Sequence, residues 1–341
     1  MTRFIMRFPS FIRRFLEINP REVEFDRRGF TCSNPEVRDH LETIGRTFLR
    51  GYSAALAHDD QNLLAKSLDQ IQPEQRGFAY EGAAMALALR DGIAFGGNAF
   101  SRFARGAGRG HIYMLHVGAG WAYARLPWTR RRIERACAKL DPVLRWLAID
   151  GYGFHQGYFE GKTQAISDLS ARLSEHGRHV FYQGLGRSLW FIEGGDVRRI
   201  CRSISQFSPL YHNDAWSGVG LACAYAGGIA PAVIAELRQE SGLHAAALAQ
   251  GVAFAAKTRQ LAGNPAPHTD MACFVICQMP AEQAAALCDT AFARINPLHS
   301  CPYQDWRLLL QKSFVSWLEI PIRGYSDELP VSSSLASSQH H

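Results

Sequence analysis

The sequence predicts an all-α protein built from helix hairpins of about 33 residues, and two observations lead to this fold class. The first is a segment of the form Gly-x-small-x-small that recurs inside apolar runs at intervals of 31, 36, 33, 33, 34 and 33 residues. The second is that no convincing run alternates apolar and polar residues, as a half-buried strand would. Self-similarity at such a period is typical of helical repeat proteins. The glycines that begin the segments are Gly51, Gly82, Gly118, Gly151, Gly184, Gly218 and Gly251.

The first element along the chain is a basic, amphipathic segment, residues 1–30. Its phenylalanines and isoleucines are interrupted by arginines and by Pro9. A secretory signal needs an uninterrupted apolar stretch, which this segment lacks. We expect it to cover the first hairpin, and the alternative is a helix on a membrane surface through residues 1–16.

Residues 31–265 are predicted to form seven hairpins, with a repeat glycine in the first helix of each. The second helices show apolar residues at a spacing of 3.6, as in residues 197–207, where arginines occupy the opposite side. Glycines that close a helix in a left-handed cap are predicted ten residues after the repeat glycine in four copies. These are Gly92, Gly161, Gly194 and Gly228.

The unit length and the ridge of small residues resemble tetratricopeptide units. We therefore expect the hairpins to stack into a tetratricopeptide-like solenoid or a partly closed toroid. After Gly251 the period is lost, and residues 266–325 are expected to form capping helices over 280–296 and 304–318. The serine-rich end, residues 326–341, is expected to be disordered.

Composition narrows the function classes. Lys and Arg number 37 against 31 Asp and Glu, and aromatic and basic residues do not interleave as in single-strand nucleic-acid binders, so we expect no nucleic-acid partner. The eight cysteines lie mostly inside apolar helical patterns, which suits free thiols in a reducing, cytoplasmic compartment. A run of about 18 apolar residues, as a transmembrane helix requires, does not occur.

The residues that precede the repeat glycines form a polar column, because equivalent positions of stacked hairpins lie side by side. Polar groups beside a tightly packed ridge are costly to bury unless they are paired. One interpretation is that they hydrogen-bond between neighbouring hairpins and fix the register of the stack. The other is that they line a groove or central cavity. The column holds Arg50, Glu81, Val117, Asp150, Gln183, Ser217 and Gln250.

Glu81 and Asp150 are the main catalytic candidates, because a carboxyl group in an apolar cavity has a raised pKa and can serve as a general acid. His155, on the glycine face of the same segment as Asp150, is a third candidate, although a histidine on an apolar helix face is more often a core residue. The candidate ligand-binding residues are Tyr80, Trp121, Phe154, Gln183, Arg187, Trp190, Asp214, Trp216, Gln250, His268 and Asp270.

No cofactor or metal is expected. Cys273 and Cys277 lie one helical turn apart, but the nearest histidine, His268, precedes a turn, and a zinc site needs four ligands. GxSxG and P-loop motifs are missing, and the repeated GxG elements lie within helices rather than after a strand, as a dinucleotide loop would.

Several strings of the sequence resemble an uncharacterised bacterial family that is labelled by a domain of unknown function and recurs in enediyne polyketide gene clusters. The similarity runs from residue 28 to about residue 295. The strings are RGFAYEGAAMALAL (76–89), HIYMLHVGAGWAYARLP (111–127), LDPVLRWLAIDGYGFHQGYF (140–159), GLGRSLWFIEGGDVRRI (184–200), DAWSGVGLACAYAGG (214–228) and PHTDMACFVICQMPAEQAA (267–285).

The resemblance implies an accessory protein beside an iterative polyketide synthase, acting on or around a polyene intermediate; it assigns no residue roles. We expect the protein to bind a hydrophobic, unsaturated chain in a helical cavity and to promote its rearrangement or cyclisation. If catalytic, it would be a lyase- or isomerase-type cyclase with carboxylate acid–base chemistry. The alternative is a non-catalytic scaffold that docks a polyketide synthase or other pathway proteins.

Overall fold

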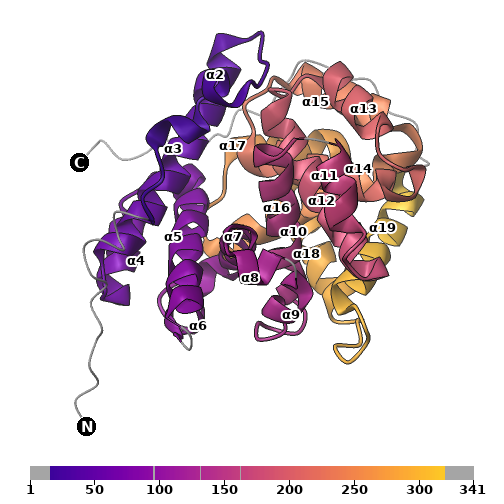
Figure 1. The fold of residues 1–341 in the computed structure, drawn as a ribbon. Coiled ribbons are helices and arrows are strands. Elements are labelled where there is room, and N and C mark those ends of the chain that lie inside the picture. The colour runs from indigo at the N-terminus through magenta and orange to yellow at the C-terminus, as the bar shows by residue number, and fades with distance from the viewer. Residues whose placement is uncertain (1–15, 95–96, 131, 162, 319–341) are drawn as a thin grey trace, which may run out of the picture.

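The repeat glycines lie in long, buried helices, which we call the core helices. The computed structural model describes residues 16–94, 97–130, 132–161 and 163–318, and every regular element in these ranges is helical (Figure 1). The prediction of an all-α fold is therefore confirmed for the described residues. The core helices are α3 (Pro35–Ala57), α5 (Pro73–Ile93), α7 (Ile112–Arg125), α10 (Arg145–Phe159), α12 (Glu175–Ile192), α14 (His212–Ala226) and α16 (Ala245–Ala262).

Shorter peripheral helices and 3₁₀ turns connect one core helix to the next. The chain direction is the same in neighbouring core helices such as α12 and α14. His179 contacts Asp214 near the N-terminal ends of the two helices, and Trp190 donates to the carbonyl of Gly227 just past the C-terminal end of α14. The peripheral helices are α4 (Gln61–Asp69), α6 (Ala99–Arg105), α8 (Pro127–Arg130), α9 (Ile133–Cys137), α11 (Thr163–Ser170), α13 (Val197–Ser205) and α15 (Pro231–Ser241), and the 3₁₀ turns are η1 (Pro20–Val23), η2 (Arg109–His111), η3 (Pro209–Tyr211) and η4 (Gly242–His244).

The repeat glycines let neighbouring core helices approach until their backbones touch. A Cβ atom added at Gly184 would lie 2.0 Å from the carbonyl oxygen of Asp150, and one at Gly218 would lie 2.0 Å from that of Gln183. In both cases the glycine contacts the carbonyl of the column residue on the preceding core helix. A side chain at either position would force the helices apart, and only glycine avoids this.

Three of the four predicted glycine caps are confirmed. Gly161, Gly194 and Gly228 have φ angles of 58°, 57° and 96°, in the left-handed region. The prediction for Gly92 is wrong, because α5 continues through it to Ile93. Thirteen consecutive residues from Gly77 to Leu89 are buried, so packing on all sides stabilises this helix past the expected stop.

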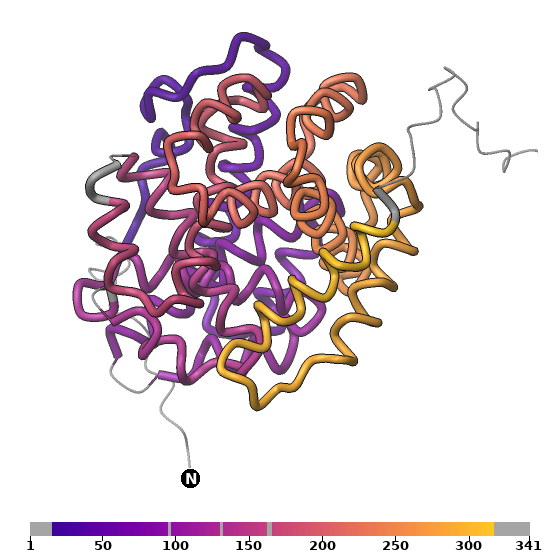
Figure 2. The backbone as a smooth tube through the Cα atoms, turned by 90° about the vertical axis from the view of Figure 1, so that its right-hand side faces the viewer, coloured from indigo at the N-terminus to yellow at the C-terminus, as the bar shows by residue number. Residues whose placement is uncertain are grey.

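The last helices return to the core helices. After α17 (Pro267–Ala272) and a π-helical turn (Cys273–Cys277) come α18 (Ala281–Phe292) and α19 (Pro302–Leu318), which confirms helices in the predicted 280–296 and 304–318 segments. Figure 2 shows α19, in yellow, crossing the other helices obliquely. Its side chains reach three core helices, since Tyr303 contacts Gln183, Arg307 contacts Asp214 and Gln311 contacts Gln250. Its contacts therefore extend beyond α16, the last core helix, to α14 and α12.

The start of α5 contacts core helices that are distant in sequence. Phe78 packs edge-on against Tyr225 of α14 with ring centroids 5.1 Å apart. Arg259 of α16 donates to the carbonyl of Glu74 at 3.1 Å, and the Asn264 amide donates to that of Pro73 at 3.1 Å. The row of core helices thus curves far enough for its early and late members to meet.

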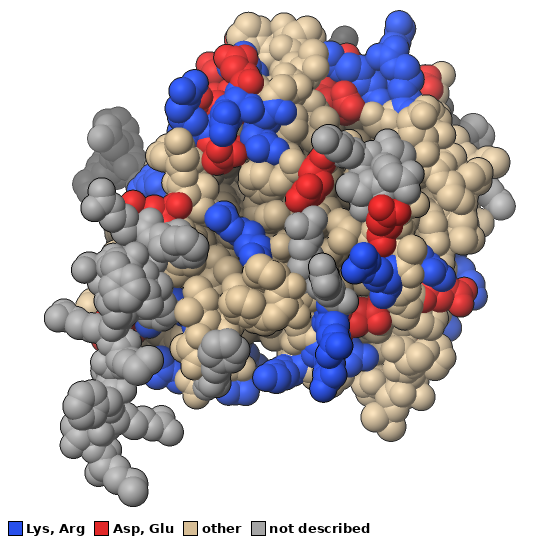
Figure 3. Space-filling view, viewed as in Figure 1, with Lys and Arg blue, Asp and Glu red and all other residues tan. Residues whose placement is uncertain are grey.

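The N-terminal and C-terminal expectations fall partly outside the described residues. Residues 1–15 are half of the expected basic segment 1–30 and nearly all of its membrane-surface alternative, 1–16. Residues 319–341 hold the end of the expected capping region 266–325 and all of the expected tail. Within the described ranges, no single helix is long and apolar enough to cross a bilayer. One pair, Pro267–Cys277 with Ala281–Phe292, reaches that length and composition together but is bent by 70°. On the face seen in Figure 3, acidic and basic side chains are interspersed.

Candidate active site

A cavity lies among α3, α5, α7, α10 and α12, and residues of the segment 18–23 complete its wall. The centre of a water molecule reaches about 60 Å³ of it, and the total space between its lining atoms, opening included, is about 650 Å³. On four successive core helices, two lining residues each occupy the column position or lie one or two turns after it. They are Glu81 and Met85, Trp121 and Arg125, Phe154 and Tyr158, and Arg187 and Phe191.

Aromatic rings form most of the apolar wall. The Trp121 ring lies between Phe48 and Phe154, with centroids 4.7 and 5.1 Å away. Phe154 in turn packs against Tyr158 and Phe191 at 5.8 and 5.5 Å. Such a wall fits a flat, hydrophobic ligand, and the faces of the rings attract a positive charge that develops beside them.

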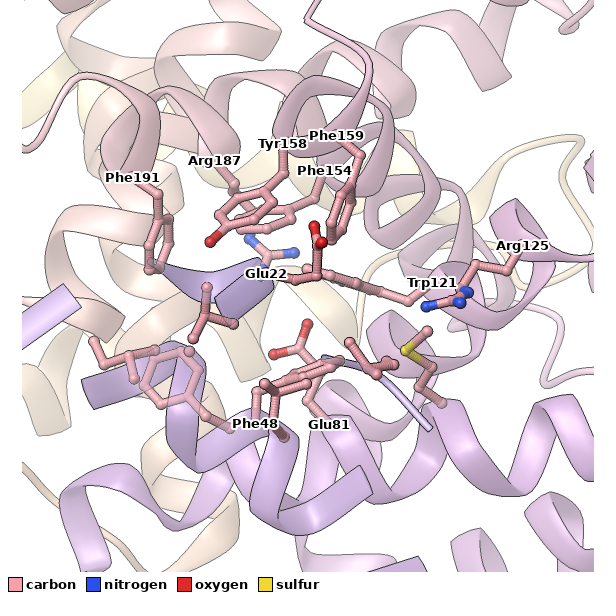
Figure 4. A pocket seen from close by; sticks show the side chains of 17 residues that line it. Glu22, Phe48, Glu81, Trp121, Arg125, Phe154, Tyr158, Phe159, Arg187 and Phe191 are labelled. Carbon is pink, nitrogen blue, oxygen red and sulfur yellow. The ribbon is translucent and has the colours of Figure 1, made fainter. Parts of the chain in front are cut away.

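Glu81 and Glu22 are the two carboxyl groups of the described residues that line this cavity. Figure 4 shows the Glu81 side chain pointing from α5 into the space between the Phe48 and Trp121 rings. The residue is only 3% exposed. The neighbouring backbone explains its position, because Gly82 packs on the carbonyl of Phe48 and Gly118 packs on the carbonyl of Glu81 itself. Close packing on both sides leaves the Glu81 side chain directed between the helices.

Burial raises the pKa of Glu81 to about 7. Desolvation of the carboxylate is the main cause; the positive charge of Arg187 lowers the pKa and the negative charge of Asp150 raises it. The Trp121 indole also lowers the pKa of Glu81, although its Nε1 has no hydrogen-bond partner of good geometry among the described residues. Near neutral pH the group is therefore divided between its acid and carboxylate forms, as a general acid–base catalyst requires.

Glu81 gives the stability of the protein a specific pH dependence. Its folded pKa of about 7 lies above the ordinary value of 4.5, so the folded state binds more protons and its stability falls as pH rises from 4.5 to 7. We expect Glu81→Gln to leave stability unchanged at pH 4.5 and to raise it above pH 7, by about 3 kcal/mol at most. Urea unfolding of both proteins at the two pH values measures this. An equal difference at both would contradict the raised pKa.

Asp150 lies behind the cavity wall and pairs with Arg187. The guanidinium of Arg187 donates to one carboxylate oxygen, and the amide of Gln183 donates to the other at 2.8 Å. The same Gln183 nitrogen contacts the Tyr303 hydroxyl at 2.9 Å. Because Arg187 lines the cavity and Asp150 does not, the structure separates the two predicted carboxylates. Glu81 faces the ligand space, and Asp150 holds the arginine beside it.

The rest of the polar column divides between the two interpretations. Ser217 donates to Gln250 at 2.9 Å, a bond between neighbouring core helices that matches the register interpretation. Neither interpretation holds for Arg50, because its side chain is exposed. It lies at the end of the row, where no core helix precedes α3. Asp150, Gln183, Ser217 and Gln250 of the column thus form cross-helix hydrogen bonds, and Glu81 is the column residue that lines the cavity.

Some predicted site residues have other partners. Trp190 is fully buried and donates to the Gly227 carbonyl at 3.0 Å, and Tyr80 donates to Asp69 at 2.9 Å while stacking on His111. Trp216 is buried in α14. These three aromatics do not line the cavity. Residues adjacent in a helix point about 100° apart, which is why a position next to the column does not face the same space.

His155 borders the aromatic wall without lining the cavity, with its ring 5.5 Å from Trp121 and 4.7 Å from Phe159. The remaining polar candidates lie elsewhere. Asp214 is paired with His179 and Arg307 at 2.7 and 2.8 Å.

Two further candidates, in the segment before the π-helical turn, also lie away from the cavity. His268 contacts the Tyr225 carbonyl at 3.0 Å, and Asp270 is exposed. Within the described residues no group of three or more His, Cys, Asp or Glu side chains is arranged to hold a metal.

Only Glu81, Trp121, Phe154 and Arg187 of the cavity wall were predicted from the sequence. The column at i, extended to i+4 and i+8, would have found Met85, Arg125, Tyr158 and Phe191, since these positions share one helix face. Phe48 and the segment 18–23 carry no comparable signal, because they lie outside the repeating pattern.

A family model described as "Protein of unknown function (DUF1702)" matches residues 8–314. The match extends beyond the 28–295 region in which the sequence strings showed a resemblance. No curated protein and no solved structure matches the chain. The family description names no activity and no pathway.

Proposed function

Since the chain belongs to the DUF1702 family, whose description assigns no activity, we propose a function from its cavity. The protein binds a hydrophobic, unsaturated chain between the aromatic rings, and Glu81 promotes the rearrangement or cyclisation of that chain. The observation that carries the proposal is a carboxyl group, with a pKa of about 7, inside an aromatic cavity. The sequence resemblance supports a place in enediyne-type polyketide biosynthesis.

The chemistry needs no second reactant. The acid form of Glu81 donates its proton to a carbon of a double bond, whose π electrons form the new C–H bond and leave a cation on the neighbouring carbon. A second double bond can attack this cation to close a ring. A carbon next to the final cation then returns a proton to the Glu81 carboxylate and forms a double bond, so the product is an isomer of the substrate.

The surrounding residues stabilise both charges that form during this reaction, the carbocation and the Glu81 carboxylate. Trp121 and Phe154 present ring faces to the cation. Arg187, held by Asp150, lies beside the carboxylate that remains on Glu81 after proton transfer. Asp150 is thus a positioning residue in this mechanism, and Arg187 stabilises the conjugate base.

We expect Glu81→Gln to abolish proton transfer to a bound polyene while leaving binding intact, because glutamine keeps the shape but has no acidic proton. Parinaric acid, a linear conjugated tetraene, is incubated with protein in heavy water, and carbon-bound deuterium is measured by mass spectrometry. A loss of about 100-fold or more is expected for general acid catalysis. Glu74→Gln, the same change on the exposed first turn of α5, is the control. Full incorporation by the Glu81 variant would overturn the proposal.

The second candidate function is a non-catalytic scaffold that docks a polyketide synthase or another pathway protein. It is favoured by the hydrogen bonds of the column, such as Ser217 to Gln250, which serve the packing of the helices rather than a ligand. A scaffold would bind no polyene, and Glu81→Gln would leave partner binding unchanged.

We further propose that the core and peripheral helices form seven tetratricopeptide-like hairpins over 31–265, curved into a partly closed toroid with capping helices over 266–318. Support comes from the recurring glycine contacts and from the contacts of α5 with α14 and α16. The free, mostly buried cysteines support a cytoplasmic location.

A further inference from the structure

A second hollow lies on the other side of two cavity residues. This polar groove is bordered by Arg28, Phe30, α10, α11, α12 and the end of α13, and Tyr158 and Phe159 line both it and the aromatic cavity. The centre of a water molecule reaches about 540 Å³ of the groove, against about 60 Å³ of the cavity. Its lining includes the hydroxyl and amide side chains of Ser167, Ser203, Gln206 and Ser208.

The Glu22–Arg28 ion pair bridges the two spaces. Glu22 lines the cavity, Arg28 lines the groove, and their nearest atoms are 3.1 Å apart. Arg28 also donates to the carbonyls of Tyr158 and Phe159 at 3.0 Å each, and its guanidinium lies 4.5 Å from the Phe159 ring centroid. Phe30, which also lines the groove, packs edge-on against Tyr158 with ring centroids 4.8 Å apart.

The aromatic cavity is too small for a long chain. Sites for drug-sized ligands typically enclose about 300–1,000 Å³ and cover most of the ligand. The cavity falls within this range only when its opening is counted, at about 650 Å³. The adjoining groove supplies further room, together with neutral hydroxyl and amide groups. Tyr158 and Phe159, which line both spaces, are the side chains that a linear molecule with a double bond beside Glu81 would pass to reach the groove.

We propose that the aromatic cavity and the polar groove are two parts of one elongated site, whose ligand is a linear unsaturated chain with an oxygenated, hydrogen-bonding end. The chain lies against the aromatic rings with its reacting double bond at Glu81. Its oxygenated end lies in the groove, among the hydroxyl side chains and near Arg28. This inference rests on the proposed function for the position of the chain and adds the class and the orientation of the ligand.

The experiment places a bulky side chain in the groove and compares the binding of two probes of different length. Gln206→Trp changes an exposed residue that lines the groove, and Ser205→Trp makes the same change at the exposed neighbouring position that does not line it. Parinaric acid is the long probe and sorbic acid, a short conjugated diene acid, is the short one. Binding is measured by fluorescence for the first and by calorimetry for the second, with circular dichroism to verify folding.

We expect Gln206→Trp to weaken parinaric acid binding by about tenfold or more and to leave sorbic acid binding unchanged, while Ser205→Trp changes neither. Equal binding of parinaric acid to wild type and to Gln206→Trp would overturn the inference, because the chain would then leave the cavity by another route, past Arg125. If neither probe binds wild-type protein, the proposed function fails as well. The proposed function is supported if wild-type protein binds both probes and Glu81→Gln loses deuterium incorporation. That result does not depend on how Gln206→Trp behaves.

Discussion

Replacing Asp150 with alanine is expected to lower the free energy of unfolding by about 3–5 kcal/mol, because it leaves a buried arginine without its counter-charge. The side chain of Arg187 is 7% exposed and that of Asp150 is 1% exposed, so water cannot replace the lost carboxylate. Gln183 loses an acceptor as well, since its amide donates to Asp150 at 2.8 Å. Urea unfolding of wild type and variant measures the difference.

A double-mutant cycle tests whether the pair causes this loss. Asp150→Leu combined with Arg187→Met removes both charges and replaces them with apolar side chains, which is often tolerated in protein interiors. We expect the double variant to be more stable than Asp150→Leu alone. If the effects of the two single substitutions simply add, Asp150 and Arg187 are not energetically coupled and the assigned positioning role is wrong.

Replacing Gly184 with alanine is expected to cost about 3 kcal/mol or more, which is at the high end for overpacking of a core. The added Cβ would lie 2.0 Å from the carbonyl oxygen of Asp150 and 2.7 Å from the amide nitrogen of Phe154. Both are backbone atoms of α10, so relief requires moving a helix rather than turning a side chain. The melting temperature and urea midpoint of the variant measure the cost.

Gly110 provides the matched control for this substitution. It lies in the 3₁₀ turn η2, is exposed, and an added Cβ would meet nothing closer than 3.9 Å. We expect Gly110→Ala to change stability by no more than about 0.5 kcal/mol, as exposed substitutions usually do. A comparable loss in both variants would show that the loss does not come from the close helix contact.

The core helices were predictable from the sequence because one physical requirement recurs in each of them. A backbone contact as close as that of Gly218 with Gln183 admits only glycine. Each such contact therefore appears in the sequence as a glycine inside an apolar run. The caps at Gly161 and Gly194 were predictable for a similar reason, since a positive φ strains other residues.

The residues of the site were less predictable, because membership depends on the direction in which a side chain points rather than on the residue type. Tyr80 and Glu81 are neighbours in α5, yet one stacks on His111 and the other enters the cavity. Glu22 comes from a segment without any repeat, and its place in the wall depends on how that segment folds over α3 and α10. The pairing of Asp150 with Arg187 was within reach, since the arginine lies one turn after Gln183, which itself contacts Asp150.

The contacts of α19 have a consequence for how the chain folds as it leaves the ribosome. Arg307 is completely buried and pairs with Asp214, which follows α13 almost a hundred residues earlier. Chains are synthesised from the N-terminus at about 5–20 residues per second, so Asp214 waits for several seconds without this partner. Core helices that pack one after another during synthesis therefore lack this buried ion pair until the last helix emerges. The nascent protein remains exposed to chaperones and proteases up to that moment.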